Sequence, residues 1–171
     1  MRKLKIGFTA AAFAPALLFC AAAAGAQDTK PCYNLASVRG DYAVVGNYGA
    51  NVAIAFGKRS VDGKGTLTGT FIVNKPVPGS LTGDRTIVSG TQVGTYTVNC
   101  DGTGVITRIL TVGTTSTQAF DDFVITGSIM KDGQLIATSI ADAQRTPSTI
   151  VTGGIFLTRV WTRVPSAQPE D

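Results

Sequence analysis

Few residues of this chain could carry out acid–base or metal chemistry. The sequence of 171 residues contains no histidine, which is the commonest general base and a frequent metal ligand. Its single glutamate is Glu170 near the C-terminus, and Asp62, Asp101 and Asp132 each precede a glycine, as in tight turns. We therefore assign no catalytic residue, no metal ligand and no cofactor, and the sequence gives little support for an enzyme.

Two adjacent aspartates, Asp121 and Asp122, lie within a stretch that the residue pattern predicts to be a strand. Side chains of neighbouring strand residues point to opposite faces, so one of the two carboxylates faces inward if the strand is regular. A buried aspartate beside an arginine is a candidate functional group. The alternative, which we favour, places them at the rim of the fold.

Two arginines near the C-terminus, Arg159 and Arg163, share one face of a predicted strand with Leu157 and Trp161. If that face is internal, the guanidinium groups could bind an anionic ligand. If it is external, the arginine stems cover the indole ring of Trp161. We favour the external arrangement.

The N-terminal segment 1–26 is typical of a signal peptide, because a basic start precedes an apolar stretch and an Ala-Gly-Ala cleavage site. We therefore expect export to the periplasm or the extracellular space. Lipidation at Cys20 is the alternative, which we disfavour because the bulky Phe19 precedes the cysteine.

Removal of this leader leaves a nearly neutral chain with one cysteine pair. The leader holds three of the 15 Lys and Arg residues and none of the 11 Asp and Glu residues. The remainder therefore lacks the basic excess that binds nucleic acid. In an exported protein, Cys32 and Cys100 are expected to form a disulfide, which would stabilise the fold by about 4 kcal/mol.

Residues 93–112 show the strand–turn–strand pattern that is also found along most of the chain. Residues 93–100 alternate between two faces, Asp101-Gly102 supplies a turn, and residues 103–112 return as a strand rich in β-branched side chains. The other predicted strands are 40–45, 52–58, 65–74, 85–89, 119–130, 134–141 and 150–164, and the proline-bearing segment 75–84 is predicted to be a loop.

Eight or nine strands joined by short turns, with no convincing helix, predict an all-β fold. We expect a single antiparallel up-and-down β-barrel of about eight strands, with a two-sheet β-sandwich as the alternative. A lead-in segment, 27–39, precedes the barrel at 40–164, and 165–171 is expected to be a disordered tail. We expect no membrane span, and a transmembrane barrel is disfavoured because the second face is largely threonine and charge. The oligomeric state stays open.

The candidate ligand contacts are aromatic. Tyr42, Phe71, Tyr96 and Phe123 lie on the faces that we assign to the interior, and Trp161 is added to this set. Ligand pockets are largely apolar with a few polar groups, so these side chains could line one. They could equally fill the core of a solid barrel.

Three motifs resemble those of a group of small secreted bacterial proteins. They are Gly40-Asp41-Tyr42, the segment Asp62–Gly69 with the pattern Asp-Gly-x-Gly-x-Leu-x-Gly, and the segment Gly94–Gly102 with the pattern Gly-x-Tyr-x-Val-x-Cys-x-Gly. The expected architecture is similar to calycin and allene-oxide-cyclase-like barrels. That resemblance implies a small apolar ligand or an isomerase-type pocket, although Tyr42 stands where lipocalins have tryptophan. It assigns no catalytic residue.

These observations lead to one expected function and two alternatives. We expect non-catalytic binding of a small apolar or amphipathic molecule. The alternatives are a structural, envelope-associated domain with a filled core, and a barrel enzyme of isomerase or cyclase type. Interior volume would distinguish binding from a structural role, and a polar cluster facing that volume would favour an enzyme.

Overall fold

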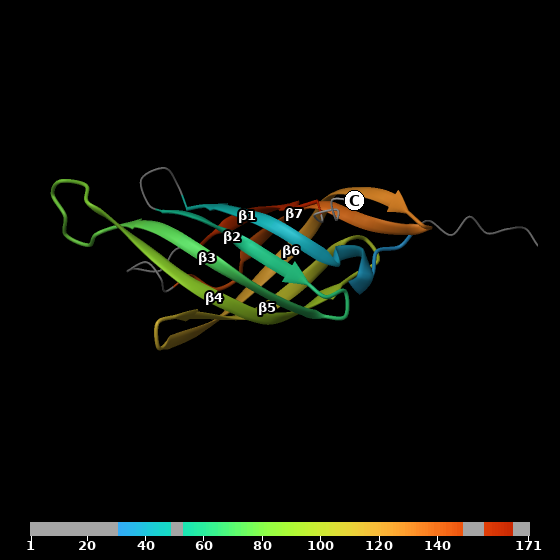
Figure 1. The fold of residues 1–171 in the computed structure, drawn as a ribbon, viewed down its shortest axis with the longest axis horizontal. Helices are drawn as coiled ribbons and strands as arrows, with labels where there is room; N and C mark the ends of the chain where they lie inside the picture. Colours follow the sequence, from blue (N-terminus) through green and yellow to red (C-terminus); the bar gives the residue numbers. More distant parts are fainter. Residues whose placement is uncertain (1–30, 49–52, 149–155, 166–171) are drawn as a thin grey trace, which may run out of the picture.

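The chain forms a closed barrel of eight antiparallel strands in the computed structural model, which describes residues 31–48, 53–148 and 156–165 (Figure 1). The strands are β1 (Gly40–Asn47), β2 (Ile54–Val61), β3 (Thr66–Pro76), β4 (Arg85–Val98), β5 (Thr103–Val112), β6 (Thr115–Lys131), β7 (Gln134–Gln144) and β8 (Thr158–Arg163). Each strand pairs with the next, and β8 pairs with β1. No strand of the described barrel is left at a free sheet edge. The predicted barrel is therefore confirmed, and the alternative of a two-sheet sandwich is wrong. No helix in these ranges is long and apolar enough to cross a membrane.

Most strand boundaries differ from the predicted ones by a few residues, and two differ more. Residues 85–89 are the first part of β4 rather than a separate strand, and at Gly90 the backbone passes against the ring of Phe71, where a Cβ atom would lie 2.5 Å from Cζ. β8 begins at Thr158, and most of the earlier part of the predicted strand 150–164 falls outside the described residues. The predicted signal peptide and residues 166–171 of the predicted tail also lie outside them.

One end of the barrel, which we call the sealed end, is covered by a short 3-10 helix, η1 (Leu35–Val38). The side chain of Asn34 caps this helix by accepting a backbone hydrogen bond at 2.9 Å. The Tyr96 hydroxyl of β4 donates to the Leu35 carbonyl at 3.2 Å. The predicted disulfide between Cys32 and Cys100 is confirmed and attaches the same segment to the β4–β5 turn.

Arg163 on β8 joins three elements at the sealed end. Its guanidinium lies over the Tyr42 ring, with 5.0 Å between Cζ and the ring centroid, and Nη2 donates to the Tyr42 hydroxyl at 2.8 Å. Its Nε donates to the Ala137 carbonyl of β7 at 2.6 Å. Gly40 has a φ of 140°, and a Cβ atom there would collide with the same guanidinium. The Gly40-Asp41-Tyr42 motif therefore meets a steric requirement where the barrel closes.

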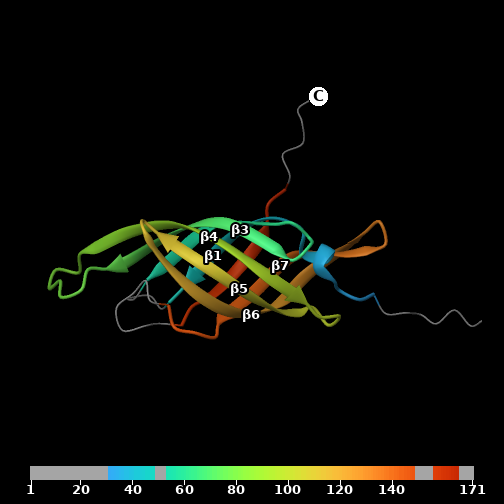
Figure 2. The ribbon, with the colours of Figure 1, turned by 90° about the horizontal axis from the view of Figure 1, so that it is seen from below.

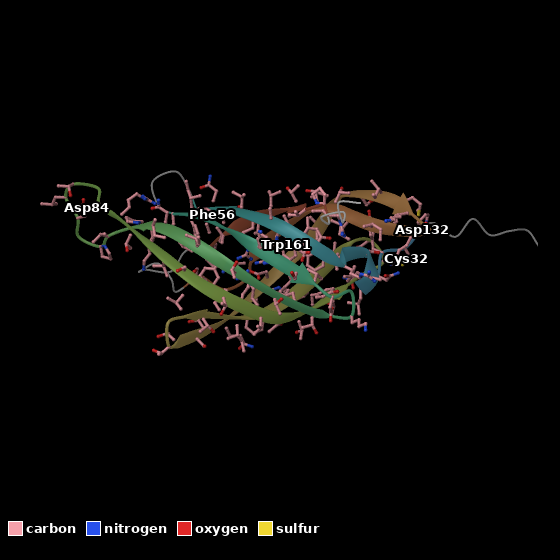
Figure 3. All side chains as sticks on the ribbon, in the orientation of Figure 1. Cys32, Phe56, Asp84, Asp132 and Trp161 are labelled. Atoms are coloured by element: carbon pink, nitrogen blue, oxygen red, sulfur yellow. A yellow bond between two sulfur atoms is a disulfide. The ribbon has the colours of Figure 1, made fainter. Side chains whose placement is uncertain are left out.

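The opposite end, which we call the loop end, carries the β3–β4 hairpin. This hairpin projects beyond the neighbouring strands, and Figure 2 shows it at the far end of the molecule from η1. Residues 77–84 form its loop, whereas Lys75 and Pro76 of the predicted loop 75–84 extend β3. The Asp84 amide donates to Ser80 Oγ at 2.9 Å. Figure 3 places Asp84 at this end, with Cys32 and Asp132 at the other.

The inward side chains form two apolar clusters with a charged layer between them. The cluster at the sealed end contains Val38, Tyr42, Val44, Val61, Leu67, Tyr96, Ile106, Phe123, Ala137, Ile140 and Trp161. The cluster at the loop end contains Ala53, Ala55, Phe71, Val73, Leu110 and Ala119. Along β5 the successive inward residues Ile106, Arg108 and Leu110 belong to the first cluster, the charged layer and the second cluster in turn.

Glycines make room for the largest inward side chains. Each arginine of the charged layer is directly opposite a glycine on a neighbouring strand, in the pairs Arg59 with Gly69, Arg108 with Gly94, and Arg159 with Gly46. In the same way, Phe71 lies opposite Gly57 and Gly90, and Phe123 lies opposite Gly104. An eight-stranded barrel is just wide enough for its interior side chains, so these pairings let long side chains reach the axis.

Gly94→Ala should destabilise the barrel. A Cβ atom at Gly94 would collide with the Thr107 carbonyl oxygen and lie 2.9 Å from Cα of Arg108, so the backbone would have to move. We expect the free energy of unfolding, measured by urea denaturation, to fall by about 1–3 kcal/mol, as is usual for overpacking.

Gly127→Ala is the matched control on β6. The closest neighbour of its Cβ atom is the side-chain oxygen of Thr138 at 3.0 Å, which can rotate away. Equal losses of stability in the two variants would contradict the requirement for glycine opposite Arg108.

Candidate functional site

A group of buried polar side chains crosses the middle of the barrel. Within the described ranges, the buried charged residues are Arg59 on β2, Arg108 on β5, Asp121 on β6, Asp142 on β7 and Arg159 on β8, each at most 5% exposed. With the buried Gln92 of β4, we call them the ionic layer. Trp161 contacts this layer, and Figure 3 shows it between the two ends of the barrel.

Asp121 binds two of the arginines. Its Oδ2 accepts a hydrogen bond from Arg108 Nε at 2.5 Å, and its Oδ1 accepts from Arg108 Nη2 at 3.1 Å. Oδ1 also accepts from Arg159 Nη2 at 2.5 Å. The pairing with Arg108 is bidentate, which is the strongest and most directional form of an arginine–carboxylate contact.

Asp142 binds Arg159 as well, together with Arg59 and the indole ring of Trp161. Its Oδ1 accepts from Arg159 Nε at 2.7 Å, and its Oδ2 accepts from Arg59 Nη1 at 2.8 Å. Trp161 Nε1 donates to the same Oδ2 at 2.7 Å. Arg59 also stacks on Trp161, with its Cζ 4.1 Å from the ring centroid. Arg159 therefore connects the two carboxylates into one network.

Gln92 completes the ionic layer on β4. Its Oε1 accepts from Arg59 Nε at 3.2 Å and from Arg108 Nη1 at 3.4 Å. In the described part of the chain, every buried side-chain nitrogen and oxygen has a hydrogen-bond partner. This matters because an unpartnered charge inside a protein is far more costly than an unpartnered neutral polar group.

The surroundings fix the charges of the layer. Burial alone would raise the pKa of Asp121, but the hydrogen bond from Arg108 and the charge of Arg159 lower it overall. Burial and the charge of Arg159 lower the pKa of Arg59 to about 9, which leaves it protonated at neutral pH. Burial lowers the pKa of Arg159, but the charges of Asp142 and Asp121 outweigh this and raise it. Burial and the charge of Arg159 also lower the pKa of Arg108, against the hydrogen bond and the charge of Asp121. Three arginines share the layer with two aspartates.

Two predicted placements are wrong. Asp121 lies deep in the interior rather than at the rim, because β6 is regular there and turns Asp122 outward, where it binds Arg145 at 2.5 Å. Arg159 lies inside rather than outside, because Asp142 on the adjacent β7 and Asp121 on β6 supply its counter-charges. Arg163, on the same face, is half-buried against Tyr42.

A cavity of about 30 Å³ adjoins the ionic layer on the side of the loop end. Its lining includes the arginines Arg59, Arg108 and Arg159, the apolar side chains Phe71, Val73, Leu110 and Leu157, and the polar side chain Gln144. This volume holds about two water molecules. It is therefore a small amphipathic cavity rather than a hollow barrel interior.

The five aromatic residues predicted to contact a ligand lie in two different parts of the barrel interior. Phe71 lines the cavity. The side chains of Tyr42, Tyr96, Phe123 and Trp161 belong to the apolar cluster at the sealed end. Burial raises the pKa of Tyr42 to about 12, although Arg163 opposes this shift. Among these five, Phe71 alone combines an inward position with a place beside the cavity.

A wide, open hollow of about 580 Å³ lies on the outside of the barrel across β1, β6, β7 and β8. Val45, Val160, Ala141 and Val124 form a row across it, each paired with the next on the adjacent strand. This row is apolar and carries no chemistry of its own. No group of three or more His, Cys, Asp or Glu side chains in the described ranges could hold a metal ion.

The sequence pattern did not single out Arg59, Gln92, Arg108 or Asp142. Two signals could have identified them. Arg108 stands in a strand of β-branched residues, in the same alternation as Ile106 and Leu110. A glycine directly opposite each arginine is the second signal, but it becomes visible only once the strand register is known.

Asp121→Asn should strongly destabilise the fold. Removal of one partner from a buried ion pair typically costs about 3–5 kcal/mol, because the remaining charge is left buried. The adjacent Asp122→Asn is the matched control, since its ion pair with Arg145 is about half exposed and such pairs contribute about 1 kcal/mol or less. Urea denaturation measures the free energy of unfolding of both variants. Equal losses of stability would contradict the inward placement of Asp121.

Asp121 should also contribute to acid sensitivity. Its pKa is lower in the folded protein than the ordinary value of 3.8, so its stabilising contribution is present above pH 3.8 and is lost as the pH falls through the folded value. We expect the unfolding temperature of the wild type to fall more steeply than that of Asp121→Asn from about pH 5 to about pH 2. Parallel curves would contradict this assignment.

Comparison with known proteins places the chain in no family. It matches no family model, no curated protein and no solved structure. The ionic layer and the cavity beside it are therefore the features from which a function can be inferred.

Proposed function

We propose that the barrel binds a small apolar or amphipathic molecule near its loop end and catalyses no reaction on it. The supporting observation is the composition of the cavity wall, in which Arg59, Arg108 and Arg159 lie beside apolar residues such as Phe71 and Leu110. A wall that is part apolar and part charged suits a ligand with the same division.

The size of the cavity limits the ligand. The free volume of about 30 Å³ accommodates a group of only a few atoms. A longer ligand would fit if inward side chains at the loop end, such as Phe71 and Leu157, moved to other rotamers. Both line the cavity, and neither belongs to the ionic layer.

The charge state of the ionic layer favours binding over catalysis. An isomerase or cyclase needs a group that gives or takes a proton near neutral pH. The pKa of Asp121 is lowered, and Arg108 holds its carboxylate in a bidentate pair. The pKa of the inward Tyr42 is raised to about 12. These two groups are therefore poor proton donors or acceptors at neutral pH.

A structural domain with a filled core is the second candidate function. Two observations favour it: the cavity is small, and the described part of the core has no unpartnered buried side-chain nitrogen or oxygen. The disulfide is compatible with either role in an oxidising, exported environment. Export and the final location stay predictions of the sequence, and the oligomeric state stays open.

Ligand titrations separate the two candidates. We expect octan-1-ol or octanoate to bind the protein in isothermal calorimetry, and Ala55→Leu to weaken binding at least about tenfold by filling the cavity that Ala55 lines. Ala43→Leu, on the outer face of β1, is the matched control and should bind as the wild type does.

Native mass spectrometry of the protein purified from its own envelope, without reductant, completes this test. An adduct of small-molecule mass would support the binding function. A bare mass, together with no heat of binding for either octyl compound, would overturn it and leave the filled structural domain.

A further inference from the structure

The ionic layer contains one more positive charge than negative charges. Arg59, Arg108 and Arg159 face Asp121 and Asp142, and no other charged residue in the described ranges is buried. The segments between those ranges, 49–52 and 149–155, contain no aspartate or glutamate. An uncompensated charge inside a protein is strongly unfavourable, so the layer would be stabilised by an additional anion.

The cavity is positioned to hold that anion. All three arginines line it. A guanidinium has five N–H groups, whereas within the ionic layer Arg59 donates two hydrogen bonds and Arg159 donates two. The other residues around the cavity are largely apolar, including Val73, Leu110 and Leu157. An apolar wall strengthens a charged hydrogen bond by lowering the local dielectric constant.

We propose that this cavity is a binding site for a small monovalent anion, a carboxylate group or a halide, held by the guanidinium groups of Arg59, Arg108 and Arg159. The proposal deepens the proposed function, because it names the acidic group of the ligand, and it rests on the same cavity. One negative charge makes the layer neutral, whereas a dianion such as sulfate would overcompensate it. The volume of about 30 Å³ also matches a halide or a carboxylate group better than a larger oxyanion.

Trp161 provides the readout for this site. It is the single tryptophan of the chain, and its indole contacts Arg59 and Asp142 of the ionic layer. We expect acetate and bromide to change its fluorescence in a saturable way. Acetamide, the uncharged analogue of acetate, should produce no such change. No saturable response to either anion would overturn the proposal.

Gln92→Glu tests the charge argument with almost no change of shape. Oε1 of Gln92 already accepts hydrogen bonds from Arg59 and Arg108, so a glutamate there supplies the missing negative charge in place. We expect acetate to bind this variant at least about tenfold more weakly, within the range measured for close charge pairs. Gln118→Glu adds the same charge at an exposed position on β6 and should bind acetate as the wild type does. Unchanged acetate binding in Gln92→Glu would overturn the proposal.

A crystal structure of the wild-type protein with bromide tests the proposal even if Gln92→Glu does not fold. An anomalous bromide peak within hydrogen-bond distance of Arg59, Arg108 or Arg159 is the expected result. Peaks confined to other sites would overturn the assignment.

The octyl ligands separate this proposal from the function on which it rests. Octanoate binding more tightly than acetate identifies the anion as the head group of an amphipathic molecule and supports both ideas. Binding of acetate and bromide without either octyl compound supports the anion site and contradicts the amphipathic ligand. Equal binding of octan-1-ol and octanoate, with no response to acetate, supports the apolar ligand and overturns the anion site.

Discussion

The contact of two buried carboxylates with three guanidinium groups is the interaction on which the interior of this barrel depends. Asp121 and Asp142 connect β2, β5, β6, β7 and β8 across the axis, and Gln92 adds β4. Buried ion pairs add little stability compared with apolar packing, but breaking them is costly. A shift of one residue in any of these strands would move a charge to the outside. The ionic layer therefore helps to specify the register of the strands.

The glycines are the steric counterpart of this layer. An arginine that reaches the axis needs space at the wall, and Gly46, Gly69 and Gly94 provide it directly across from the three arginines. Glycines also lie directly opposite Phe71 and Phe123 and leave space for their rings. The result is a nearly filled interior with a small cavity where the arginines meet the apolar cluster of the loop end. Charge and shape together favour a ligand of limited size.

Local patterns were enough to predict most strands and tight turns, because alternation and turn chemistry act between residues close in sequence. The barrel followed from the number of strands, and the disulfide between Cys32 and Cys100 followed from the cysteine count after removal of the leader. They did not show which face of the last strand is internal. The face that carries Arg159 and Trp161 also suits an outer surface, and the counter-charges lie 17 and 38 residues away in Asp142 and Asp121. The cavity arises from contacts between distant strands and has no local sequence signal.

The burial of the arginines can be tested directly by nuclear magnetic resonance of their Nε–H groups. Arg59, Arg108 and Arg159 each donate from Nε to a buried acceptor, whereas the ion pair of Arg145 is about half exposed. We expect three Nε–H signals that exchange slowly with solvent and an Arg145 signal that exchanges much faster. Fast exchange of all four signals would contradict a charged layer inside the barrel, and with it the binding site proposed beside that layer.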